Sequence, residues 1–153
     1  MSIQEALDQA PLQLVMPENT PQGIDLVDTR ISHADDPNYD IVYLVYARSR
    51  PPEEYSLKDI VDSGGFVVIE SRHSWPDSYV NQLYSKYGSD EVPHAYVKTV
   101  HNLRIILGDG GWKLEAIIYA KDEIYDIVMS PRLGMDKLDM VATSMAKQIE
   151  TKQ

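Results

Sequence analysis

The amino-acid sequence predicts an α+β fold: a single, curved antiparallel β-sheet of about six strands with a C-terminal helix packed on one face. Short segments that alternate apolar and polar residues recur between turn residues, as strands do. The clearest is 112–119, in which every second residue is apolar. From Met135 to Ile149 the apolar residues recur instead at helical spacing. Helix-capping residues around 76–87 predict a middle helix, which we expect at an edge or opening of the sheet.

The N-terminal part of the chain predicts a short helix followed by an irregular crossing segment. Ser2 and Glu5 form a capping-box pattern, so we expect a helix over 2–9 that ends before the next proline. A brief extended piece follows at 12–15. The two prolines within 16–23 favour turns over any regular element.

Residues 24–31 and 40–48 predict two strands joined by a polar turn. Neither face of 41–46 is polar. This pattern is typical of a central strand covered on both sides, and equally of a strand whose tyrosines line a wet groove. Both interpretations stay open at the level of sequence.

A short helix is expected next, over one or two turns after Ser56. Ser56 and Asp59 have the spacing of a capping pair, and the Gly64–Gly65 pair ends the helical segment. The apolar segment 66–70 then predicts a strand.

The middle helix is expected over 76–87. Ser74 and Asp77 form a second capping pattern, Pro76 suits the first turn of a helix, and Gly88 ends it. Its apolar stripe would be formed by Tyr79, Val80, Leu83, Tyr84 and Tyr87.

The C-terminal part of the chain predicts two hairpins and the closing helix. The strands are expected at 95–100, 104–107, 112–119 and 124–129. The three glycines of Gly108 to Gly111 tolerate positive φ, which suits a tight hairpin turn. Pro131 ends the sheet, and the helix follows over 135–149.

Composition excludes several functional classes. The 153 residues suit one domain over 1–153, and 14 basic against 24 acidic residues give a formal net charge of −10. Such a charge repels phosphate backbones, so we expect no nucleic-acid partner. The absence of cysteine excludes disulfides, zinc-thiolate sites and thiol nucleophiles.

Membrane insertion by these residues is also not expected. No apolar run approaches the roughly 20 residues that a spanning helix needs, and the first residues lack the pattern of a signal peptide. The sequence is compatible with a trimmed domain from the outer face of a bacterial membrane, and with a complete cytoplasmic chain.

The four histidines show no metal-binding or catalytic spacing. They stand at positions 33, 73, 94 and 101. His94 and His101 could meet across a strand pair, and their convergence with carboxylates in a pocket would indicate an enzyme. No serine has a local base partner or a nucleophile-elbow motif. We therefore predict no catalytic residue, no metal and no cofactor.

Two other motifs imitate ligand sites without completing them. Asp36, Asn38 and Asp40 match the start of a calcium loop, but Ile41 stands at its glycine position and Ala47 at its glutamate position. An Asx-type turn is favoured instead. The glycine-rich segment before Trp112 lacks the lysine of a phosphate-binding loop and precedes a strand rather than a helix.

The aromatic composition is the most unusual feature, because ten tyrosines stand against one phenylalanine. Tyrosine combines aromatic area with a hydroxyl group, which suits wet interfaces as well as half-buried packing. Six tyrosines are predicted to border one binding groove between the sheet and the middle helix: Tyr43, Tyr46, Tyr79, Tyr84, Tyr87 and Tyr96.

Both ends of the chain resemble a bacterial family of domains of unknown function. The resembling residues are 2–7, Leu14 to Pro17 and Thr20 to Gly23, together with the tryptophan- and tyrosine-bearing strands and the Ala-Thr-Ser motif at 142–144. That family occurs at the outer ends of membrane-anchored, anti-sigma-factor-like proteins. The chain departs from it at Thr20, where the family has leucine, and 49–88 matches nothing in it.

The resemblance implies a fold and a setting, but it transfers no functional residue. More distantly the chain is similar to lipoprotein-carrier and sigma-regulator sensor domains, which are built on a curved antiparallel sheet. We therefore expect a non-catalytic sensing or binding module of a bacterial envelope protein, with a protein or a small apolar or peptide ligand as partner. The alternatives are an intracellular acidic interaction or immunity-type protein that meets a basic partner, and an enzyme.

Overall fold

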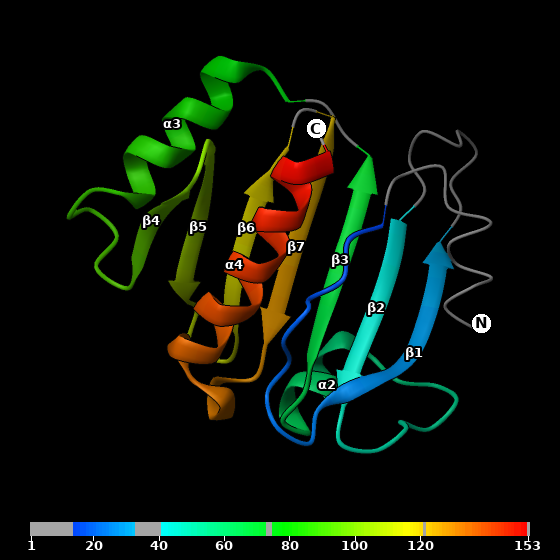
Figure 1. The fold of residues 1–153 in the computed structure, drawn as a ribbon. Coiled ribbons are helices and arrows are strands. Elements are labelled where there is room, and N and C mark those ends of the chain that lie inside the picture. The colour runs from blue at the N-terminus through cyan, green and yellow to red at the C-terminus, as the bar shows by residue number, and fades with distance from the viewer. Residues whose placement is uncertain (1–13, 33–40, 73–74, 121, 153) are drawn as a thin grey trace.

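The computed structural model describes residues 14–32, 41–72, 75–120 and 122–152, and it shows one seven-stranded antiparallel sheet (Figure 1). The strand order is β1-β2-β3-β7-β6-β5-β4. The strands are β1 (Asp25–Ser32), β2 (Ile41–Ala47), β3 (Phe66–Arg72), β4 (Ala95–Val100), β5 (Leu103–Asp109), β6 (Leu114–Tyr119) and β7 (Glu123–Met129). The predicted α+β class is confirmed, with seven strands where about six were expected. The helix predicted over 2–9 lies outside the described residues.

The described helices lie on both faces of the sheet. They are α2 (Leu57–Asp62), α3 (Asp77–Tyr87), α4 (Met135–Lys152) and the short 3-10 helix η2 (Pro131–Leu133). The long helix α4 packs on β5, β6 and β7, as predicted for the C-terminal helix. The middle helix α3 packs against β4 and β5 at the edge of the sheet. Side chains alternate between the two faces of a strand. Ile60 of α2 packs with Val45 and Val67, and Tyr84 of α3 contacts Tyr119, whereas the strand neighbours of these residues belong to the core under α4. Both helices therefore lie on the face opposite α4.

The core lies between α4 and the sheet. The helical stripe predicted from sequence faces the strands and is buried almost completely; it consists of Leu138, Val141, Ala142, Met145, Ala146 and Ile149. On β6, Leu114, Ala116 and Ile118 are buried on the same face, which confirms the period of two in that strand.

The segment before β1 covers the other half of this face. It crosses β3 and β2 as an extended chain without regular structure (Figure 1). Its Val15 N–H donates to Oε1 of the buried Glu70 at 2.7 Å, and Gln148 Nε2 of α4 donates to the Met16 carbonyl at 2.5 Å. Because Leu14 and Val15 are themselves buried, this segment is part of the core.

The starts of the two middle helices follow different rules. At α2 the predicted capping box is confirmed, since the Ser56 side chain accepts from the Asp59 N–H while the Asp59 side chain accepts from the Ser56 N–H. At α3 the N-cap is Pro76, without a side-chain cap, rather than Ser74. Pro76 itself has an extended ψ of 137°, so the helix begins at Asp77. A proline also disfavours helical backbone in the residue before it.

The β5–β6 hairpin turns two residues later than predicted. β5 continues to Asp109, which pairs with Leu114, and the Asp109 carboxylate accepts from the Gly111 N–H at 2.9 Å. The turn therefore runs through Gly110 to Lys113, and Trp112 stands exposed at its tip instead of in the strand. The side-chain acceptor of Asp109 is what favours this register.

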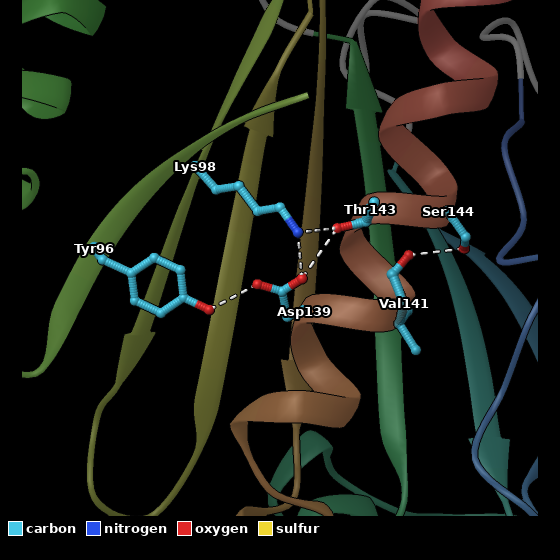
Figure 2. Close-up of polar contacts among 6 residues, drawn as sticks. All are labelled: Tyr96, Lys98, Asp139, Val141, Thr143 and Ser144. Atoms are coloured by element: carbon cyan, nitrogen blue, oxygen red, sulfur yellow. Dashed lines mark hydrogen bonds and ion pairs between the residues drawn. The ribbon is translucent and has the colours of Figure 1, made fainter. Parts of the chain in front are cut away.

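A polar cluster holds α4 against the edge strand β4 (Figure 2). Asp139 of α4 accepts from Lys98 Nζ at 2.6 Å, from the Tyr96 hydroxyl at 2.9 Å and from the Thr143 hydroxyl at 3.2 Å. Next to it, the buried Ser144 hydroxyl donates to the Val141 carbonyl within the helix. The small and hydroxyl residues at 142–144 thus have packing roles in this structure.

The charge of Asp139 is expected to stabilise the docking of α4. Burial raises the pKa of this carboxyl, but hydrogen bonds from Lys98 and Tyr96 and the charge of Lys98 outweigh it, so the pKa lies below the ordinary value of 3.8. Asp139→Asn should lower the free energy of unfolding by about 1 kcal/mol at neutral pH. The stabilisation is present above the pKa of the unfolded chain and is lost as pH falls through the folded pKa.

Urea unfolding of Asp139→Asn at neutral and acidic pH measures this effect. The exposed Asp122→Asn provides the control, because it makes the same chemical change outside the cluster. A difference between Asp139→Asn and the native chain that stays constant down to the acid transition would contradict the assignment.

Candidate functional site

The structure separates the six predicted tyrosines into different environments. Tyr46 is a core residue, because its ring stacks on Phe66 with centroids 4.5 Å apart and burial raises the pKa of its hydroxyl. Tyr96 lies on the α4 face and binds Asp139. Tyr43 lies on the opposite face, where with Tyr55 it lines a small hollow of about 170 Å³ near α2.

The other three predicted tyrosines come together on α3. Tyr84 is buried against the sheet, Tyr79 is exposed, and Tyr87 lines a separate hollow. Tyr84 meets Tyr119 of β6 edge-on, with ring centroids 6.2 Å apart. The structure thus forms an aromatic contact between helix and sheet, and of the six predicted tyrosines Tyr84 is the one that takes part in it.

A groove of about 340 Å³ lies between α3 and the adjoining ends of β5 and β6. We call it the α3 groove. Its lining residues are Trp75, Asp77, Val80, Asn81, Tyr84, Asn102, Leu103, Arg104, Tyr119 and Ala120. This volume is at the lower end of the range of small-molecule sites, about 300 to 1,000 Å³.

Tyr84 and Arg104 hold one wall of the groove in place. The Arg104 guanidinium lies over the Tyr84 ring, 4.2 Å from its centroid, and Nη2 donates to Asn81 Oδ1 at 2.9 Å. The Tyr84 hydroxyl donates to the Arg104 carbonyl at 3.3 Å. These contacts tie α3 to β5 and fix the guanidinium plane, so this wall is organised before any ligand binds.

The rest of the lining offers aromatic surface and unused polar groups. Trp75 stacks on Tyr79 with centroids 5.0 Å apart and remains 39% exposed. Within the described part of the chain, the side chains of Asp77 and Asn102 make no hydrogen bond. The groove therefore presents a carboxylate and an amide beside an exposed indole.

Tyr119 contributes a neutral hydroxyl to the groove. Burial, together with the nearby Tyr79 and Tyr84, raises the pKa of Tyr119 to about 12. The group therefore stays protonated at physiological pH and can both donate and accept a hydrogen bond. Binding through this hydroxyl does not require a base that removes its proton.

The two described histidines do not converge. His94 precedes β4 and His101 follows it, so the full length of that strand, about 20 Å, separates them. His94 lines a hollow of about 290 Å³ with Tyr87, Asp109 and Glu115. Among the described residues, no three histidine or carboxylate side chains are placed to hold a metal ion. The calcium-like residues Asp36, Asn38 and Asp40 lie outside them.

Comparisons of the chain with models of known families, with curated proteins and with solved structures give no match. The resemblance to envelope domains stays a prediction. No helix in the described ranges is both long and apolar enough to cross a membrane.

Sequence reasoning missed most of the α3 groove. Trp75, Asn102 and Arg104 stand at element ends, where no periodic pattern assigns a face. Tyr119 was within reach, since the period of two in β6 already placed it on the face opposite Leu114. The Tyr84–Tyr119 contact itself depends on where α3 packs on the sheet, which alternation does not give.

Proposed function

We propose that the chain is a non-catalytic binding module of the sensing type, whose ligand occupies the α3 groove. The observation that carries the proposal is the groove itself. It combines an exposed indole with a fixed guanidinium and with polar side chains that have no partner within the described part of the chain. A few convergent polar groups in a hollow with aromatic walls are typical of ligand sites.

Binding without catalysis is supported by the distribution of reactive groups. In the α3 groove the ionisable groups are Asp77, Arg104 and two tyrosines, and neither described histidine lines it. A hydroxyl nucleophile needs a base within hydrogen-bond reach, and the groove lining offers no such pair. We infer that a ligand is held there and released unchanged.

The test uses the two tryptophans as reporters inside one protein. Each contributes one indole N–H signal to the NMR spectrum of ¹⁵N-labelled protein, and Trp112→Phe assigns them. Trp75 lines the groove, whereas Trp112 stands 47% exposed at the β5–β6 turn. The probes are neutral disaccharides, a tryptic digest of casein and ANS, an amphipathic anionic dye with a large apolar ring system.

At least one probe class should shift the Trp75 signal saturably and leave the Trp112 signal unchanged. Trp75→Ala removes this reporter, so its binding is followed through the backbone amide signals of the groove residues; it should be about tenfold weaker or more, because aromatic anchors dominate small sites. Trp112→Phe should leave it unchanged. If no class shifts the Trp75 signal, or if both signals shift together in every titration, the α3 groove is not the binding site.

The family resemblance adds a setting to this proposal. We propose that the module senses its ligand on the outer face of a bacterial membrane, as an extracytoplasmic part of an envelope protein. The complete reading frame decides this part, because such a protein needs a membrane-spanning or lipid-anchored segment. A frame without one contradicts the envelope setting and leaves the binding role to be judged by NMR.

A further inference from the structure

The polar groups of the α3 groove show which chemistry complements them. Asp77 can only accept hydrogen bonds, Arg104 can only donate them, and the Asn102 amide and Tyr119 hydroxyl can do both. A ligand that satisfies all four must itself carry groups that donate and accept at neighbouring positions. Hydroxyl groups have this property, whereas carboxylates, ammonium groups and hydrocarbons do not.

The charge of the groove favours a neutral ligand. One carboxylate and one guanidinium line it, so their formal charges cancel. The chain as a whole carries a formal charge of −10, which opposes the approach of anions. Arg104 is already engaged by the Tyr84 ring and by Asn81, which leaves only part of its donors for a ligand.

The exposed indole supplies the apolar part of the site. Trp75 is held by its stacking on Tyr79 and still presents aromatic surface to the groove. The flat face of a pyranose ring carries C–H groups, and it packs on an indole while the hydroxyls at the ring edge meet polar side chains. An indole next to amide, carboxylate and guanidinium groups thus complements both parts of a sugar.

We propose that the α3 groove binds a neutral saccharide, with one ring against Trp75 and its hydroxyls on Asp77, Asn102, Arg104 and Tyr119. This inference rests on the proposed binding function and adds the ligand class. The volume of about 340 Å³ suits one or two sugar rings rather than an enclosed longer chain. The four polar residues come from α3, from the β4–β5 turn, from β5 and from β6, so only the folded chain assembles the site.

Titration of ¹⁵N-labelled protein with maltose, cellobiose and N,N′-diacetylchitobiose tests the inference through the Trp75 indole signal. At least one disaccharide should shift this signal saturably at millimolar concentration. A soluble maltodextrin, run beside maltose, distinguishes a free sugar from internal units of a longer glycan as the source. Binding of either one supports the saccharide chemistry.

Asn102→Ala keeps the Trp75 reporter and removes one polar contact, so it should weaken disaccharide binding about tenfold. Asp77→Asn is the second variant, because it keeps the size of the side chain, removes its charge and turns one acceptor oxygen into a donor. Asn19→Ala changes an exposed asparagine outside the groove and should bind within about twofold of the native chain. The thermal transition of each variant checks that it is folded.

The outcomes separate this inference from the function on which it rests. If the peptides or ANS shift the Trp75 signal and no saccharide does, the ligand class is wrong while the binding function stands. If disaccharides bind equally well to Asn102→Ala, to Asp77→Asn and to the native chain, the assigned contacts are wrong. If no probe of any class shifts the signal, the inference and the proposed function both fail.

Discussion

Gly65→Ala is expected to destabilise the protein by about 3 kcal/mol, although it adds a single methyl group. Gly65 joins α2 to β3 and is bonded on both sides: its N–H donates to the Ile60 carbonyl, and its carbonyl accepts from the Ser130 N–H, both at 3.0 Å. A Cβ at this position would collide with the Tyr46 carbonyl oxygen and stand 3.1 Å from Ile60 Cγ2. Because backbone atoms form the obstacle, no rotamer change relieves the collision.

Thermal unfolding followed by circular dichroism measures this effect, with an expected fall in Tm of roughly 6 to 12 °C. Gly108→Ala is the matched control. Its added Cβ would find its nearest neighbour, Ala95 Cβ, at 3.4 Å, which is ordinary contact, and the position lies in a strand. We expect Gly108→Ala to change stability by less than about 0.5 kcal/mol. Equal Tm values for the two variants would show that the Tyr46 carbonyl oxygen of β2 does not lie as close to Gly65 as the structure places it.

Asp126→Asn is expected to stabilise the protein at alkaline pH. Asp126 lies on the face of β7 opposite the core, next to Glu115 and Tyr119 of β6 and near Lys113. Its Oδ1 is buried and has no hydrogen-bond partner among the described residues, while Glu115 pairs with Lys113 at 3.3 Å. Burial first, and then the neighbouring Glu115, raise the pKa of Asp126 to about 8.

The sign of the pH dependence follows from this raised pKa. Below the ordinary value of 3.8 both the folded and the unfolded chain hold the proton, so the group carries no penalty. As pH rises towards 8 the unfolded chain releases the proton while the folded chain retains it, and stability falls. Asparagine carries no charge at any pH. The variant should therefore be more stable than the native chain above that pKa, by on the order of 3 kcal/mol.

Urea unfolding from mildly acidic to alkaline pH measures the difference. The native chain should lose stability over this range more steeply than Asp126→Asn. The exposed Asp90→Asn removes a carboxylate without burial and should follow the native profile. Parallel profiles for Asp126→Asn and the native chain would mean that Asp126 is ionised in the fold at little cost.

The local elements of this protein are largely predictable because their signals are local. The α2 capping box depends on Ser56 and Asp59 alone. The buried stripe of α4 depends only on apolar residues that recur three or four positions apart within that helix. Errors occurred where a single side chain shifted a boundary. Asp109 moved the hairpin turn and left Trp112 exposed, and Pro76 moved the start of α3.

The candidate site was less predictable because it depends on which strands are neighbours. The sequence order gives no sign that β3 pairs with β7. It also does not show that α3 packs on β4 and β5, which is what brings Tyr84 against Tyr119 of β6. The sequence predicts Tyr46 and Tyr96 in the same groove as the α3 tyrosines, but they contact Phe66 and Asp139 instead. Alternation along a strand shows which residues share a face, but it does not show which helix covers that face.

By itself, therefore, the sequence determined the α+β class, the positions of the strands and helices, and the residues of α4 that form the core, since hydrophobic periodicity and capping act within a few residues. Only the tertiary structure decided the strand order, the burial of Glu70 under Val15 and the gathering of Trp75, Asn102, Arg104 and Tyr119 in one groove. Each of these depends on contacts between segments far apart in the chain, which the packing of the whole core selects.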